Sequence, residues 1–137
     1  MTDLRIAVIG GRKFNDYDSM ESVLSSFIDI HKEKDICIVS GGARGADSLA
    51  EKYAGENGIK FELYPADWDR FGKIAGFVRN KEMIKGADRV IAFWNGKSSG
   101  TKHAIEVAAK NDIPSYVVGF DGYTPRKKKN ESQLSLL

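Results

Sequence analysis

The sequence predicts an α/β domain built on an open, mainly parallel sheet of about five strands with helices on both faces. Two observations carry this prediction. Several of five short apolar runs are continuous rather than alternating, which is typical of strands buried on both faces. Segments whose apolar residues recur at helical spacing separate the runs, and strands that alternate with helices build right-handed βαβ units. We therefore expect a Rossmann-like sheet with the strand order 3-2-1-4-5.

The five expected strands lie at residues 4–9, 35–40, 59–64, 88–94 and 114–118. Cys37, the single cysteine, belongs to the second of these runs. One cysteine cannot form an intrachain disulfide, and its apolar neighbours predict a buried, structural thiol.

The first two expected helices follow the first two strands. One has an apolar stripe over 20–28, with Asp18 as the candidate N-cap and Glu21 three residues later. The other has its stripe over 46–54, and Gly58 is placed to end it.

The third expected helix covers about 74–87, and the fourth has its stripe over 104–109, with Ser98 or Ser99 as its cap and Pro114 beyond its end. The longest irregular stretch, 65–71, is expected at one mouth of the sheet. Its Trp68 and Phe71 either offer a flat surface to a base or cap the core, and the core position is the favoured interpretation.

Length and composition fit a single domain. A chain of 137 residues with 42% hydrophobic content can bury a sizeable core, which we expect within 1–122. A polar, basic tail follows at 123–137, and the net charge of +2 does not indicate a nucleic-acid partner. No apolar run approaches the ~20 residues that cross a bilayer, and no leader pattern is present, so we expect a cytoplasmic protein with no membrane partner.

Glycine-rich loops follow three expected strands, at the edge of the sheet where the carboxyl ends of parallel strands meet and ligands bind. They contain Gly10-Gly11-Arg12, the run 40–47 and the run 95–101. Glycine lets the backbone approach a phosphate, hydroxyl and arginine side chains donate to it, and helix N-termini favour anions. One such loop is equally consistent with an ordinary turn. Three at one edge predict a phosphate site.

Several chemistries are not indicated. Neither the dinucleotide fingerprint nor a P-loop follows the first strand, which disfavours nicotinamide-dependent oxidoreductases and NTPases. No spacing of His, Cys, Asp or Glu predicts a metal site, no cofactor is expected, and no nucleophile and base pair is visible, so catalytic residues stay unassigned. Glu106 and Lys110 are spaced as a surface pair on the fourth helix.

The third helix has an amide on its inward stripe, because Asn80 lies three residues after Phe77 and four before Ile84. A buried amide needs partners, so Asn80 either ties loops together or contacts the ligand. Its neighbour Arg79 either points toward the loop edge or is solvated.

Three ordered motifs resemble the SLOG superfamily, in its YspA-like, cpYpsA-related branch of small bacterial and phage proteins. They are SGGARGAD at 40–47, W-x-x-x-G-K-x-A-G-x-x-R-N-x-x-M at 68–83 and AFWNGKSSGT at 92–101. The resemblance implies a Rossmann-like domain that binds nucleotides or nucleotide-derived molecules, with members proposed as sensors or processors of such ligands in conflict between bacteria and phages. The ligand-binding positions that it and the loops indicate are Gly10, Gly11, Arg12, Ser40, Gly41, Gly42, Arg44, Gly45, Asp47, Arg79, Asn80, Ser99, Gly100 and Thr101.

Enzymatic relatives, the LOG-type phosphoribohydrolases, carry P-G-G-x-G-T-x-x-E with a catalytic Glu. Here the residue three after Thr101 is Ala104, so the resemblance does not supply that carboxylate. DprA, another relative, binds single-stranded DNA, but a basic groove with stacking aromatics is not evident from this sequence.

Three functional hypotheses follow. In the first, a nucleotide-derived ligand is bound with Arg12 and Arg44 neutralising its phosphate, while Asp47 accepts from ribose or caps the second helix. In the second, an N-glycosidic or phosphate bond is hydrolysed with Asp47 or Glu106 as the carboxylate and Arg79 stabilising charge. The third is single-stranded DNA binding. For Asn80 we favour contact with the ligand over a role in joining loops. By analogy with related domains, we also expect a homo-oligomer.

Overall fold

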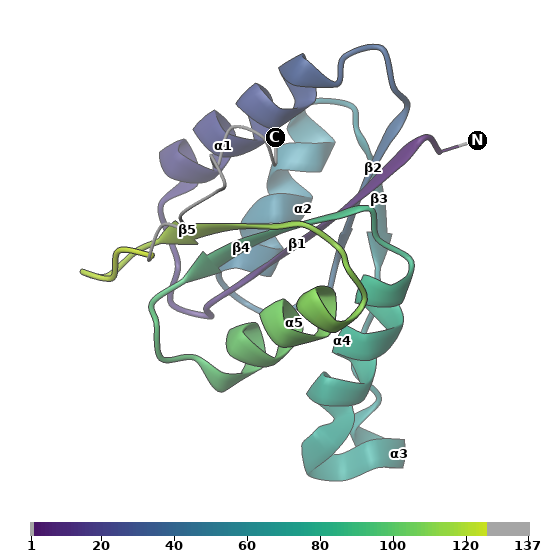
Figure 1. Cartoon of the computed structure of the whole chain (residues 1–137), viewed down its shortest axis with the longest axis vertical. Helices are drawn as coiled ribbons and strands as arrows, with labels where there is room; N and C mark the ends of the chain where they lie inside the picture. Colours follow the sequence, from purple (N-terminus) through teal and green to yellow (C-terminus); the bar gives the residue numbers. More distant parts are fainter. Residues whose placement is uncertain (1, 126–137) are drawn as a thin grey trace.

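The computed structural model describes residues 2–125 and contains one five-stranded sheet (Figure 1). The strands are β1 (Leu4–Gly10), β2 (Ile36–Ser40), β3 (Lys60–Leu63), β4 (Arg89–Trp94) and β5 (Ser115–Gly119). They lie in the order β3-β2-β1-β4-β5, and each neighbouring pair is parallel. The predicted fold class and strand order are confirmed. Residues 126–137 of the predicted basic tail lie outside the described residues.

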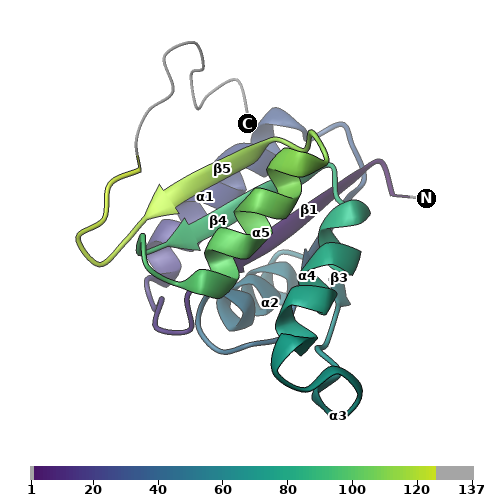
Figure 2. The same ribbon diagram turned by 60° about the horizontal axis from the view of Figure 1, so that its bottom comes forward.

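Helices cover both faces of the sheet (Figure 2). On one face α1 (Tyr17–Ile30) and α2 (Ala46–Glu56) enclose a buried cluster that includes Phe27, Ile38 and Phe93. On the other face α4 (Ala75–Lys85) and α5 (Ser99–Lys110) enclose a second cluster. Each face therefore has its own apolar core, as continuous apolar strands predict.

One helix start differs from the prediction, and a second agrees with it in position only. Asp16, not Asp18, is the N-cap of α1, because its carboxylate accepts a hydrogen bond from the Ser19 N–H at 3.0 Å. Asp18 lies in the first turn, where its charge still favours the helix dipole. Ser98 occupies the N-cap position of α5, but its side chain makes no capping bond.

The stretch 65–71 is more regular than expected. It contains a one-turn helix, α3 (Trp68–Phe71), capped by Asp67 and continued by the 3-10 turn η1 (Gly72–Ile74) into α4. Figure 1 shows α3 standing away from the rest of the domain. Trp68 is 53% exposed, so the interpretation that it caps the core is wrong.

Phe77 is also exposed, contrary to its predicted inward position, and its ring lies 4.5 Å from that of His103. The sheet-facing side of α4 instead uses the smaller Ala75 at its start, followed by Asn80, Met83 and Ile84. Asn80 is buried, as the spacing predicted.

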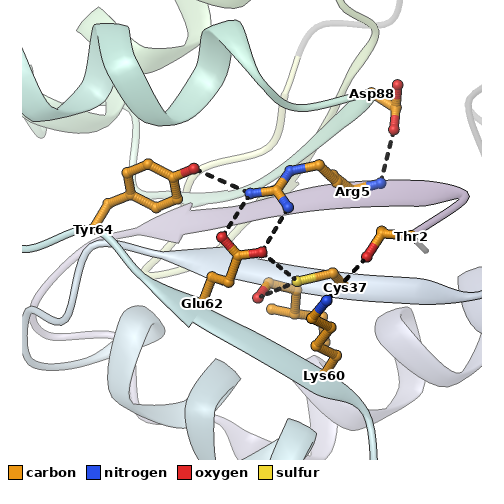
Figure 3. Close-up of polar contacts among 8 residues, drawn as sticks. Thr2, Arg5, Cys37, Lys60, Glu62, Tyr64 and Asp88 are labelled. Carbon is orange, nitrogen blue, oxygen red and sulfur yellow. Dashed lines mark hydrogen bonds and ion pairs between the residues drawn. The ribbon is translucent and has the colours of Figure 1, made fainter.

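A polar cluster joins three strands on the α4 side of the sheet (Figure 3). The Arg5 guanidinium donates to both Glu62 carboxylate oxygens, at 2.6 and 3.1 Å, and to the Tyr64 hydroxyl at 3.1 Å. Cys37 is buried, as predicted, and its thiol donates to Glu62. Burial raises the pKa of the thiol, and Arg5 lowers the pKa of the Glu62 carboxyl. Arg5 and Glu62 form the only ion pair within residues 2–125. Glu106 and Lys110 do not form one.

Candidate functional site

A cleft of about 430 Å³ opens at the carboxyl ends of β1, β2 and β4, between the glycine-rich loops and the start of α4. This is the point at which the strand order reverses, with β2 on one side of β1 and β4 on the other. Most predicted site residues line it: Gly10, Gly11, Arg12, Gly41, Asp47, Arg79, Asn80, Ser99, Gly100 and Thr101. Gly42 and Arg44 line an adjoining hollow, and Ser40 and Gly45 line neither space. Contact of Ser40, Gly42, Arg44 and Gly45 with a ligand stays a prediction.

Some of these glycines are required by the protein's own packing. A β-carbon on Gly10 would lie 2.6 Å from the Phe93 carbonyl oxygen, and one on Gly45 would clash with the Gly11 carbonyl. Gly45 also has φ +75°, which side chains rarely adopt. Gly41 has no room because the Arg79 guanidinium packs against it. These glycines bring the start of α2 and the loops close together.

Gly100 is different, because the fold does not require it. It lies in the first turn of α5, it does not have a positive φ, and a β-carbon there would meet nothing within 4 Å. Glycine also lowers helix stability relative to alanine. Neither packing nor backbone conformation therefore explains why position 100 is a glycine. Gly100 is among the residues that line the cleft.

Two helices begin at the cleft without a side-chain cap. The N-cap of α2 is Gly45, which has no side chain, and the Ser98 hydroxyl at the start of α5 lies 3.3 Å from the Thr101 hydroxyl instead of bonding a backbone N–H. The first N–H groups of a helix have no intrahelical partner and carry partial positive charge. The start of α5 can therefore donate to an anion, whereas the first N–H of α2, that of Ala46, already donates to the Gly11 carbonyl at 3.2 Å.

The charged side chains around the cleft are mostly positive. Among the described residues its lining holds the cations Arg12, Lys13, Lys73 and Arg79, against the single carboxylate of Asp47. The lining is thus more cationic than the chain as a whole, in which Lys and Arg number 21 and Asp and Glu number 19. Arg12 and Lys13 are exposed, which leaves them free to approach a ligand.

Asp47 is buried at the start of α2, and its carboxylate accepts a hydrogen bond from the Ala43 N–H at 3.0 Å. The carboxylate thus reaches back to the loop before the helix, and the predicted capping of α2 is wrong because Gly45 holds that position. Burial raises the pKa of Asp47, although the Ala43 N–H, Arg79, Ser40 and Arg12 act in the opposite direction. The buried Ser40 hydroxyl lies near this carboxylate without forming a well-aligned hydrogen bond among the described residues.

Arg79 and Asn80 connect the loop after β2, the end of β3 and the start of α5. Arg79 Nη1 donates to the carbonyls of Gly41 at 2.8 Å and Tyr64 at 3.3 Å, and its Nε donates to Asn80 Oδ1 at 3.0 Å. Asn80 Nδ2 in turn donates to the Gly100 carbonyl at 3.2 Å. Arg79 is therefore not a solvated arginine, and Asn80 joins loops, one of its two predicted roles. Contact between Asn80 and a ligand stays a prediction.

Asn80 also lies 3.4 Å from His103 Nδ1, and burial lowers the pKa of that histidine. The neutral imidazole can accept from the Asn80 amide, which fixes the orientation of the amide. Glu106, the other carboxylate considered for catalysis, is exposed on α5 and does not line the cleft.

Sequence reasoning missed several lining residues, among them Lys13, Lys73, Asn95 and Phe120. Lys73 lies within the G-K step of the motif at 68–83 and could have been found there. Phe120 had no local signal, because it reaches the cleft by packing over Gly11 and against Phe14. Within residues 2–125, no group of three His, Cys, Asp or Glu side chains is placed to hold a metal ion, and no helix is long and apolar enough to span a membrane.

Comparisons with known proteins identify relatives of the chain. Gene 61 protein of Mycobacterium phage D29 is 38% identical over 124 residues, which cover 85% of this chain and 95% of the phage protein. Residues 4–71 match the family described as YspA, cpYpsA-related SLOG.

Two solved structures share the fold. DNA processing protein A (DprA) from Streptococcus pneumoniae superposes with a TM-score of 0.69 at 20% identity, over 83% of this chain and 50% of that chain. DprA from Helicobacter pylori, described for its single-stranded DNA binding mode, gives 0.60 at 22% identity, over 98% of this chain and 71% of that chain. The chain thus spans half the length of the pneumococcal structure. With its five-stranded Rossmann-like sheet, its phage relative and its matching motifs, this chain belongs to the YspA, cpYpsA-related SLOG family.

Proposed function

We propose that the protein binds a nucleotide or a nucleotide-derived small molecule, with the phosphate on the loops that follow β1, β2 and β4. The observation that carries this proposal is that the uncapped start of α5 lies at a cleft whose charged lining is mostly cationic. Helix N-termini and guanidinium groups both favour phosphate, and the arrangement gives a negative group several donors at once.

Each part of such a ligand has a matching group in the cleft. The phosphate would lie beside Gly100, because Ser99, Thr101 and, from the loop after β1, Arg12 line the same cleft. The Asp47 carboxylate is an acceptor for ribose hydroxyls. The exposed Phe77, which also lines the cleft, offers an apolar ring to a base.

The biological setting belongs to the same proposal. A nucleotide ligand held without turnover suits a sensor, and the phage relative is consistent with a signalling nucleotide in conflict between bacteria and phages. We place this role in the cytoplasm, where such ligands are made.

Calorimetric titration with a nucleoside and with its mono- and diphosphate tests the proposal. Because a hydrogen bond to a charged group contributes about 1.5 to 3 kcal/mol, the monophosphate should bind at least about tenfold more tightly than the nucleoside. Native mass spectrometry of the protein purified from cells identifies a co-purified nucleotide directly. Equal affinities for all three compounds would contradict a phosphate site.

Hydrolysis of a nucleotide is a second candidate, favoured by one observation. Asp47 is a buried carboxyl inside the cleft, and its raised pKa is a feature of groups that transfer protons. Incubation of a nucleotide panel with the purified protein distinguishes the two functions. Release of free base or phosphate that Asp47→Asn abolishes supports the enzyme, and ligand-induced thermal stabilisation without product supports the binding protein.

Single-stranded DNA binding is a third candidate, suggested by the H. pylori neighbour and by Trp68 among the cations. This neighbour weakens our sequence-based expectation against a nucleic-acid partner. Binding to DNA through many phosphates falls steeply with salt, whereas binding of a small ligand depends on salt much less. The slope of log Kd against log salt for an oligonucleotide therefore separates these candidates.

A further inference from the structure

A second hollow, of about 370 Å³, adjoins the cleft on its β3 side. The two spaces share part of their walls, namely Arg12, Gly41, Ala43, Trp68 and Arg79. Each volume falls within the range of pockets for small molecules, about 300 to 1,000 Å³. The cleft and the hollow therefore form two adjacent compartments with a common wall.

The lining of the second hollow combines apolar surface with positive charge. Leu63 is 51% exposed and Trp68 is 53% exposed, and both belong to this lining. Leu63 packs over Gly42, where a β-carbon would lie 2.7 Å from the leucine Cδ1, so the loop and the end of β3 form one continuous wall. Arg12, Arg44 and Arg79 supply the charge, and no carboxylate is present in the described lining.

An apolar face beside guanidinium groups is the combination that recognises a base with a neighbouring phosphate. The cleft has the same combination, with the exposed Phe77 and Arg12 in its lining. A phosphate near Arg12 is thus placed to join one nucleoside in the cleft to another in the hollow.

We propose that the site takes a ligand of two nucleoside units bridged by phosphate, with the second unit in the hollow formed by Arg44, Leu63, Ala66 and Trp68. This inference rests on the proposed function, because the first unit occupies the phosphate site described above. The second unit is held by stacking on Trp68 and by charge from Arg44, and both interactions are absent for a mononucleotide.

Calorimetry with three probes of increasing length tests the proposal, in an adenine and in a guanine series. The probes are the 5′-mononucleotide, the 5′-phosphorylated dinucleotide and the 5′-phosphorylated tetranucleotide. The dinucleotide should bind at least about tenfold more tightly than the mononucleotide, since stacking of one base alone accounts for such a factor. The tetranucleotide should gain no more than about threefold over the dinucleotide, the number of two-unit registers along it.

Variants in the hollow locate the second unit. Arg44 lines the hollow and not the cleft, so this proposal assigns it to the second unit and not to the first phosphate, as the sequence had suggested. Arg44→Ala and Ala66→Trp should therefore remove the gain of the dinucleotide and leave the affinity for the mononucleotide unchanged. Arg89→Ala is the matched control, since Arg89 starts β4 at the opposite end of that strand and bonds only the Asp88 carbonyl among the described residues. Arg44 is exposed, so its variant should fold even if Ala66→Trp does not.

The outcomes separate this inference from the proposed function. If the mononucleotide binds and the dinucleotide binds no more tightly, or if Arg44→Ala weakens both equally, the two-unit site is wrong and the phosphate site stands. If affinity continues to rise with length and depends steeply on salt, the surface is a groove for single-stranded nucleic acid, which also overturns the two-unit site. If no probe binds, both proposals fail.

Discussion

Replacement of Gly100 by alanine separates the needs of the fold from the needs of a ligand. The fold has room for the added methyl group, because nothing lies within 4 Å of its position, and the Asn80 bond to the Gly100 carbonyl involves only the backbone. A phosphate beside the first turn of α5 would be displaced by the same methyl group. Stability and affinity should therefore change in opposite directions.

The expected magnitudes follow from these contacts. Alanine is more favourable than glycine in a helix by about 0.5 to 1 kcal/mol, which for a domain of this size raises the Tm by roughly 2 to 4 °C. Loss of a charge-assisted hydrogen bond to phosphate costs about 1.5 to 3 kcal/mol, or roughly a 10- to 150-fold increase in Kd.

Thermal melts and calorimetry of the Gly100→Ala variant measure both quantities. Gly55→Ala is the matched control, since Gly55 lies in α2, also has free space around it and does not line the cleft. The control should gain stability and retain full affinity. If Gly100→Ala binds as tightly as the wild type while its Tm rises, the ligand does not approach α5 and the reasoning is refuted.

Three further predictions test the polar groups. Asn80→Leu should lower the stability of the empty protein by about 1 to 3 kcal/mol, because it leaves the Gly100 carbonyl unpaired. It should also reduce the rise in Tm that the ligand causes, and an unchanged rise in thermal melts would exclude ligand contact. Asp47→Asn should raise the Tm at pH 7. The folded protein raises the pKa of the Asp47 carboxyl, so the wild type loses stability as the pH rises through that pKa, and the neutral amide does not. The gain in Tm should vanish near pH 4, and a gain that does not depend on pH would contradict this origin. Glu62→Gln should lower the free energy of unfolding at pH 7 by less than about 1 kcal/mol, because Arg5 lowers the Glu62 pKa and the pair is partly exposed. In denaturant titrations the difference from the wild type should shrink as the pH falls below about 4, where the wild type loses the ion pair too.

Much of the fold could be predicted because its signals are local. Continuous apolar runs such as Ile36–Ser40 and helical stripes such as that of α1 depend on residues close together in sequence, and short right-handed connections then leave few possible sheet orders. The position of the cleft followed from the same order, since glycine-rich loops after parallel strands must meet at one edge.

The details that could not be predicted depend on long-range packing. Arg79 contacts the carbonyl of Gly41, which lies 38 residues earlier, and no local pattern reveals that bond. The spacing of Phe77 suggested an inward ring, but the ring is exposed and lies beside His103 of α5. Asp18 has the right residue type for a cap, and only the path of the chain shows that Asp16 takes that role.

Backbone amide NMR tests the central claim, that a nucleotide phosphate lies between the glycine-rich loops, most directly. In ¹⁵N-labelled protein, a nucleoside monophosphate should shift the amide signals of Gly11, Gly100 and Thr101, and the unphosphorylated nucleoside should leave them nearly unchanged. Equal shifts with both compounds, or shifts confined to α1 and β5 away from the cleft, would contradict the account.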